Sequence, residues 1–316
     1  MSMHPTIHFA TLRAPLRRWR PSPSARWTCI GALAIPLWAT WPTLALRTRE
    51  LPIFEVLSIA YLVGWLTLNA LERARARTTE TSAVLGDSAT SVPRIASAWQ
   101  SRIPALMFAI GVAGSAALFV FATNYIAAAE ANLISYLWPG MIAAFGGMLG
   151  IFRLRTRQVM GIALGFVGAF IVMRGGSLSF SYPGMGLALL SGALWAAYCV
   201  YRLKWPAAPR SILAQGCAMS GALCAALHFL GEPTVMPTVG IAAGAITIGI
   251  IPTALGNFLW DQGFRRGDSK LLAVMAYATP LCSALLLSFL GMESLTWNLL
   301  IGAVVIAVAG MLSRTA

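Results

Sequence analysis

Charged side chains are scarce in this chain of 316 residues. Only 10% of its residues are charged and 58% are hydrophobic, whereas soluble domains carry roughly 25% charged residues. This shortage excludes a soluble protein. A bilayer core about 30 Å thick is crossed by a helix of roughly 20 apolar residues, and apolar blocks of that size recur along the whole sequence. The sequence therefore predicts an all-α integral membrane protein.

Residues that catalyse reactions or bind metals are also few. Of three histidines, His4 and His8 lie in the N-terminal tail and His228 stands alone, and the five cysteines fall inside apolar blocks at no metal-like spacing. No glycine-rich loop followed by Lys and Ser or Thr could cradle a phosphate. We therefore expect no enzyme, disulfide framework, metal site, cofactor or ATP-driven pump.

The charge that is present is strongly basic, with a net value of +13. We count ten spans with a cytoplasmic start, and all but three of the 23 Lys and Arg residues (Arg47, Arg49 and Arg174) then fall on the cytoplasmic side. The positive-inside rule predicts this bias, so the basicity indicates topology and not nucleic-acid binding. The predicted location is the cell inner membrane, multi-pass, with both termini cytoplasmic. The ten spans cover residues 27–46, 51–71, 103–123, 125–149, 158–173, 183–203, 211–230, 239–260, 271–291 and 297–313.

An internal repeat relates the two halves of the chain. Aligning Pro139 with Pro280 also places Tyr136 on Tyr277, a shift of 141 residues. Five spans per half is an odd number, so the second half must enter the membrane from the opposite side. We expect two inverted five-helix repeats, 27–173 and 183–313, around a central cavity, as in many transporters. Residues 1–26 are expected to be a disordered cytoplasmic tail and residues 72–102 a cytoplasmic loop.

The stretch AEANLISYLWPG, residues 129–140, carries polar groups into an apolar block. Glu130 is a functional candidate because a carboxylate is costly at bilayer depth; the competing interpretation is a wetted interfacial carboxylate. Asn132 and Tyr136, four apart, share a helical face, whereas Trp138 lies nearer to Glu130. We predict that Tyr136 and Trp138 both border the pathway, with a kink re-aiming one of them.

Prolines supply the expected kink. Pro139 and Pro280 each remove a backbone hydrogen bond and clash with the carbonyl four residues earlier, and their equivalent repeat positions favour a hinge role over mere tolerance. Pro36, Pro42 and Pro252 are further candidate bends.

Aromatic and amide side chains complete the candidate cavity. Trp38 and Trp195 are related by the repeat and lie mid-span, where an interfacial belt does not explain them; Trp260 fits such a belt. Tyr198 and Tyr277 are further cavity candidates, and Asn257, Thr253 and Gln215 could add polar contacts. Gly161, Gly165 and Gly168 predict close helix packing on the fifth span.

The ten-span plan with a proline in spans four and nine resembles the EamA-type drug/metabolite transporter superfamily. Within it, Glu130 followed nine residues later by Pro139, through SYLWP, resembles the bacterial aromatic amino acid exporters. The resemblance implies a ten-helix fold around a mostly hydrophobic cavity, alternating access, and export of aromatic and other amino acids. It makes Tyr136, Trp138, Trp195 and, more loosely, Trp38 cavity residues.

The leading prediction is an inner-membrane exporter of aromatic and other apolar amino acids. Its expected partners are a small-molecule substrate and the lipid bilayer, with the monomer as the expected unit. The alternative is an exporter of lipophilic cations or drugs in which Glu130 is the counter-charge. A carrier of phosphorylated sugars or nucleotides would need buried Lys or Arg, and a channel would need a charged or carbonyl-rich filter motif; neither feature is found.

Overall fold

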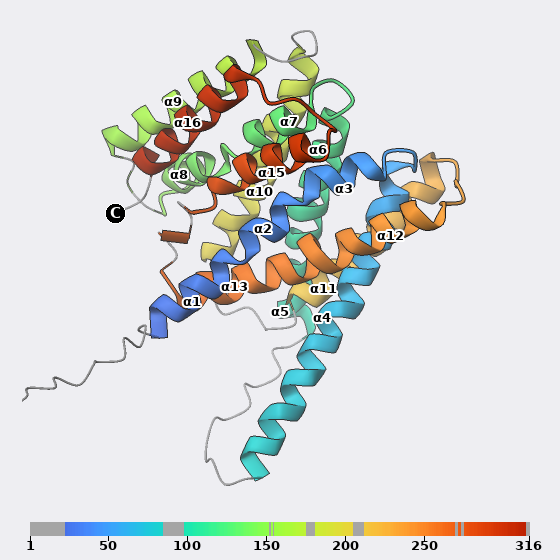
Figure 1. The fold of residues 1–316 in the computed structure, drawn as a ribbon. Helices are drawn as coiled ribbons and strands as arrows, with labels where there is room; N and C mark the ends of the chain where they lie inside the picture. The colour runs from blue at the N-terminus through green and yellow to red at the C-terminus, as the bar shows by residue number, and fades with distance from the viewer. Residues whose placement is uncertain are drawn as a thin grey trace, which may run out of the picture.

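The computed structural model describes residues 23–84, 98–151, 153, 155–174, 181–204, 212–268, 271–272 and 275–313, which form helices joined by turns and short loops (Figure 1). Six helical stretches are long and apolar enough to cross a membrane, and three shorter ones are also apolar. Large apolar side chains such as Phe166, Phe229 and Val304 are exposed, as a lipid-facing surface requires. The chain is a multi-pass helical membrane protein.

The first half of the chain consists of α1 (Pro23–Ala32), α2 (Ala34–Ala39), α3 (Trp41–Arg47), α4 (Ile53–Val84), α5 (Ala98–Phe108), the π-helix η1 (Ala109–Ala113), α6 (Gly114–Ala122), α7 (Ala128–Ser135), α8 (Trp138–Met148) and α9 (Thr156–Arg174). The second half consists of α10 (Tyr182–Lys204), α11 (Ile212–Gly231), α12 (Val239–Ile248), the π-helix η2 (Gly249–Gly256), α13 (Asn257–Arg266), α15 (Ala278–Phe289) and α16 (Trp297–Ser313).

Helices from the two halves pack in antiparallel pairs, and small residues allow the close approach. A Cβ on Gly168 of α9 would lie 2.7 Å from Ile306 Cγ1 of α16, whereas one on Gly165 would meet Ala309. The earlier residue of α9 therefore faces the later residue of α16. The two helices run in opposite directions, side by side in Figure 1. The predicted packing role of Gly165 and Gly168 is confirmed.

The pair α4 and α11 follows the same pattern. Gly64 faces Cys217, Gly221 faces Leu62, and the Phe54 N–H donates to Glu232 beyond the end of α11. Numbers rise along α4 as they fall along α11, so these two helices are also antiparallel. Both pairs join spans that the predicted repeat would make equivalent, the fifth with the tenth and the second with the seventh.

The helices break at the predicted prolines. Turns at Tyr136–Leu137 and Ala276–Tyr277 interrupt the fourth and ninth spans just before Pro139 and Pro280. Pro36 and Pro42 lie in the first turns of α2 and α3, which divide the first span into short helices. Proline fits a helix's first turn, where its missing N–H costs nothing, so each break begins a new helix near the proline.

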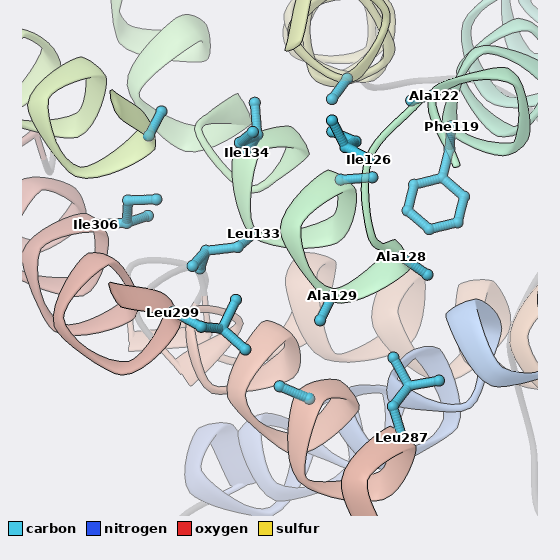
Figure 2. Close-up of a cluster of buried hydrophobic side chains, with 14 of the residues drawn as sticks. Phe119, Ala122, Ile126, Ala128, Ala129, Leu133, Ile134, Leu287, Leu299 and Ile306 are labelled. Carbon is cyan, nitrogen blue, oxygen red and sulfur yellow. The ribbon is translucent and has the colours of Figure 1, made fainter. Parts of the chain in front are cut away.

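Helix α7 is the most enclosed element, with all eight of its residues buried. Figure 2 shows its side chains meeting Phe119 of α6, Leu287 of α15, and Leu299 and Ile306 of α16. A polar residue on α7 is therefore almost fully removed from solvent, which raises the cost of leaving its hydrogen bonds unmade.

Two predicted boundaries differ from the structure. The expected loop over 72–102 is shorter, because α4 runs on to Val84 and α5 begins at Ala98; the Arg, Ala and Glu residues after Leu71 are strong helix formers. The expected tail over 1–26 ends earlier, since α1 begins at Pro23. Residues 1–22 lie outside the described residues.

Candidate functional site

A cavity of about 150 Å³ lies among six of the ten predicted spans. Its walls are mostly aromatic and small side chains, and none of its lining residues is Lys, Arg, His, Asp or Glu. The lining consists of Trp38, Trp41, Tyr61, Val112, Ser115, Ala116, Phe119, Asn132, Ser135, Tyr136, Trp138, Ser191, Gly192, Trp195, Pro252, Thr253 and Asn257. The chemistry of the walls favours an uncharged or zwitterionic ligand with an apolar part.

Four indole rings, which we call the tryptophan cluster, pack together on one side of the cavity: Trp38, Trp138 and Trp195 line it, and Trp260 lies behind them. The Trp38 ring centroid lies 5.0 Å from that of Trp260 and 6.0 Å from that of Trp195, and Trp138 lies 6.4 Å from both Trp195 and Trp260. Such edge-to-face and tilted pairs stabilise each other. The cluster gives the cavity a rigid aromatic wall.

Irregular backbone surrounds the cavity. Val112 belongs to η1, Pro252 and Thr253 belong to η2, and Tyr136 and Trp138 flank the break between α7 and α8. Single π-turns inside α-helices are often found at functional sites, and helices broken at mid-membrane depth form the binding sites of many transporters. The break also explains why Tyr136 and Trp138, which a straight helix would separate, both line the cavity with ring centroids 6.3 Å apart.

Polar groups of the walls make local hydrogen bonds. The Ser191 hydroxyl donates to the Ser115 carbonyl at 2.8 Å, Ser135 donates to the Ala131 carbonyl at 2.8 Å, and Asn257 Nδ2 donates to the Thr253 carbonyl at 2.8 Å. Asn132 Nδ2 differs from these groups, because it is buried and has no hydrogen-bond partner among the described residues.

Three predicted site residues lie outside the lining. Glu130, only 6% exposed, sits in the first turn of α7, where its Oε2 accepts the Ala127 N–H at 3.3 Å. Tyr198 packs behind Trp195, with ring centroids 5.9 Å apart. Tyr277 packs against Gly310 of α16. The predicted cavity residues Trp38, Asn132, Tyr136, Trp138, Trp195 and Asn257 are brought together in one lining.

The sequence predicts Trp260 in an interfacial belt, and the structure shows that this prediction is wrong. Its side chain is buried in the tryptophan cluster and also stacks on Phe264, with centroids 5.6 Å apart. Trp260 lies near the end of its predicted span, where a belt is usual, but the packing of α13 against α1 and α2 covers its side chain. Gln215 of α11 does not line the cavity.

Several lining residues were missed: Trp41, Tyr61, Ser115, Phe119, Ser135 and Ser191. Each sits in an apolar span among similar residues, and no spacing within one helix distinguishes it. Only the packing of α6 against α10 places Ser115 and Ser191 within 3.1 Å of each other.

His228 stands alone in the sequence, but the structure gives it polar neighbours. Its Nδ1 lies 3.1 Å from Glu232 Oε2, its Nε2 lies 3.1 Å from the Thr234 hydroxyl, and Glu55 Oε2 is 3.9 Å away. Glu232 in turn accepts the N–H groups of Phe54 and Glu55 at the start of α4. These hydrogen bonds, in which His228 and Glu55 are buried, tie the start of α4 to the end of α11.

Comparison with known proteins gives the family. Residues 182–315 match the EamA-like transporter family. The aromatic amino acid exporter YddG of Ancylobacter novellus is 31% identical over 297 residues, 91% of this chain and 98% of that protein. YddG of Escherichia coli K12 is 24% identical over 302 residues, 90% of this chain and 95% of that protein.

A solved crystal structure also resembles this fold, with a TM-score of 0.68 and 28% sequence identity over 91% of this chain and 96% of the other. Sequence and structure therefore agree over nearly the whole length, and not only over the second half. The relatives are transporters rather than enzymes. The chain is a multi-pass membrane transporter that belongs to the EamA-like transporter family.

Proposed function

We propose that this protein exports aromatic and other apolar amino acids across the cell inner membrane, working as a monomer by alternating access. The relatives named as aromatic amino acid exporters support this function. The observation that carries it is the cavity itself: an aromatic wall beside a few polar groups and no Lys, Arg, His, Asp or Glu side chain. Such a site suits a zwitterion whose side chain is a ring.

The size of the cavity fits one ring. A cavity of about 150 Å³ lined by apolar side chains accommodates benzene, and this cavity has about that volume. A phenyl ring against the tryptophan cluster would gain edge-to-face contacts. The α-amino and α-carboxylate groups would then meet polar residues of the lining such as Asn132, Ser135 and Asn257.

Inverted repeats support alternating access. α9 begins 141 residues before α16, η1 shifted by 141 residues falls inside η2, and the helix breaks before Pro139 and Pro280 are related by the same shift within one residue. The antiparallel packing of α9 with α16 and of α4 with α11 is what two repeats of opposite orientation produce. Rocking of one repeat against the other about the cavity would expose it to each side in turn.

A lipophilic-cation exporter is the competing function. It requires a counter-charge at the substrate, and Glu130 is the carboxylate that the sequence offers. Its side chain caps its own helix and does not line the cavity. This placement favours a structural role for Glu130 and the amino acid exporter over the cation exporter.

Transport in liposomes tests the proposal. Purified protein is reconstituted, and uptake of labelled Phe, Trp, Thr and a quaternary ammonium dye is followed with and without a pH gradient. We expect saturable flux of Phe and Trp that Tyr136→Ala abolishes and Glu130→Gln preserves. Dye transport lost in Glu130→Gln would instead establish the cation exporter, and no amino acid flux in the wild type would refute the proposed function.

A further inference from the structure

Asn132 lies on α7, four residues before the break that carries Tyr136, and its side chain forms part of the cavity wall. It is only 5% exposed. Its Nδ2 makes no hydrogen bond to any described residue, and among the five buried polar atoms in that condition it is the one whose residue lines the cavity. A buried amide without a partner is costly.

Neighbouring polar groups do not share this property. The Ser135 hydroxyl donates to the carbonyls of Ala131 and Ala188, at 2.8 and 3.1 Å, and the Asn257 amide donates to its own helix. These bonds hold side chains to the backbone and are complete without a ligand. Asn132 Nδ2 is therefore a fully buried donor, on a residue that lines the cavity, whose hydrogen bond is not completed by the described residues.

The chemistry of this donor selects one part of a zwitterion. An amide N–H₂ group only donates, so it matches the α-carboxylate and not the α-ammonium group. A hydrogen bond to a charged acceptor is stronger than one between neutral groups. No Lys, Arg or His lines the cavity to bind a carboxylate instead.

We propose that Asn132 binds the α-carboxylate of the transported amino acid through Nδ2 and so distinguishes amino acids from aromatic amines of the same size. This inference rests on the proposed function, since it assumes that an amino acid occupies the cavity. The substrate's carboxylate would satisfy the buried amide, while its ring would contact the tryptophan cluster on the aromatic side.

Binding to the purified full-length protein tests this role, with L-phenylalanine and phenethylamine as probes. Phenethylamine keeps the ring and the ammonium group but has no carboxylate. The variants are Asn132→Leu, which removes the donor, and Asn132→Asp, which keeps the shape but offers a carboxylate. Asn69→Leu is the matched control, because Asn69 bonds to the Trp65 carbonyl in its own helix and is remote from the cavity.

Losing a hydrogen bond to a charged group should weaken phenylalanine binding by about 10- to 100-fold in Asn132→Leu. Asn132→Asp should weaken it at least as much, because two carboxylates repel. Phenethylamine affinity should change less than about threefold in Asn132→Leu, and Asn69→Leu should behave as wild type. Chromatographic behaviour and melting temperature establish folding, and Asn132→Asp carries the test if Asn132→Leu does not fold.

Equal weakening for both probes would assign Asn132 a structural role and overturn the inference, as would unchanged phenylalanine binding in folded variants. Failure of the proposed function looks different: the wild type itself would then neither bind nor transport phenylalanine.

Discussion

Gly150 and Gly291, 141 residues apart, end α8 and α15 in the same left-handed conformation, with φ of +67° and +66°. The N–H of the next residue, Ile151 or Met292, donates to the carbonyl of Gly146 or Leu287 at 2.8 and 2.9 Å, in the six-to-one bond of a Schellman cap. Glycine adopts positive φ at little cost. The shift of 141 residues that relates Pro139 to Pro280 therefore also relates the caps that end the same helices.

The tryptophan cluster should determine affinity for aromatic substrates. Trp138→Leu removes a ring whose centroid lies 6.3 to 6.4 Å from those of Tyr136, Trp195 and Trp260. We expect the apparent affinity for Phe and Trp to fall about tenfold, since aromatic pairs contribute about 0.5–1.5 kcal/mol each. Uptake kinetics measure it. Trp297→Leu, at an exposed residue at the start of α16, should have no effect; equal effects of the two variants would refute the assignment.

The break between α7 and α8 should control the rate of transport. Pro139→Ala restores an N–H that can bond to the Ser135 carbonyl, which now packs against Gly192 of α10. A continuous, straighter helix should lower the maximal rate at least about tenfold, with little change in phenylalanine affinity.

The matched control for the hinge is Pro183→Ala, because Pro183 also lies in the first turn of a helix, α10, but α10 follows the non-helical Ser181 and not a turn that joins it to a preceding helix. Pro280→Ala should behave like Pro139→Ala. A rate unchanged in both variants, with binding intact, would contradict a hinge role.

Glu293 should stabilise the fold by capping α7. Its carboxylate oxygens accept the Ala128 N–H at 2.6 Å and the Ala129 N–H at 3.0 Å, across the two halves of the chain. Glu293→Gln keeps the shape but removes the charge, which a helix N-terminus favours by about 0.3–1 kcal/mol and up to about 2. The melting temperature in detergent should fall by a few degrees. Glu50→Gln, at an exposed carboxylate, should leave it unchanged; identical behaviour of the two variants would exclude the capping role.

The close contact between α9 and α16 depends on Gly168, which has no side chain. Gly168→Val would bring a Cβ to 2.7 Å from Ile306 and 3.1 Å from Val305, so the helices would have to separate. We expect a loss of about 1–3 kcal/mol, seen as a lower melting temperature and a lower yield of folded protein. Gly186→Ala, whose Cβ would meet nothing within 4 Å, should be neutral or stabilising. A stable Gly168→Val would show that this face tolerates separation.

Much of the fold follows from sequence pattern. The apolar blocks predict the helices, and Pro139 and Pro280 predict the breaks because a missing N–H acts locally. The ends of the helices are predicted less accurately. Helix α4, for example, continues to Val84 because the residues after the predicted span favour a helix.

The site was less predictable. The mid-span positions of Trp38 and Trp195, the kinked polar stretch that holds Tyr136 and Trp138, and the family resemblance predict these four as cavity residues, and all four line the cavity. Glu130 is a functional candidate in the sequence because a carboxylate is rare in such a segment. Its hydrogen bond from the Ala127 N–H, which caps α7, can be recognised only when the start of that helix is known.

By itself the sequence determined that this is a multi-pass helical membrane protein with breaks at set points, because the bilayer requires long apolar helices and proline interrupts their hydrogen bonds locally. Only the tertiary structure decided which aromatic rings face the cavity, that Trp260 supports them from behind, and that the amide of Asn132 has no partner. Those properties depend on contacts between helices far apart in the chain. At each break, the packing also determines how the second helix is oriented relative to the first.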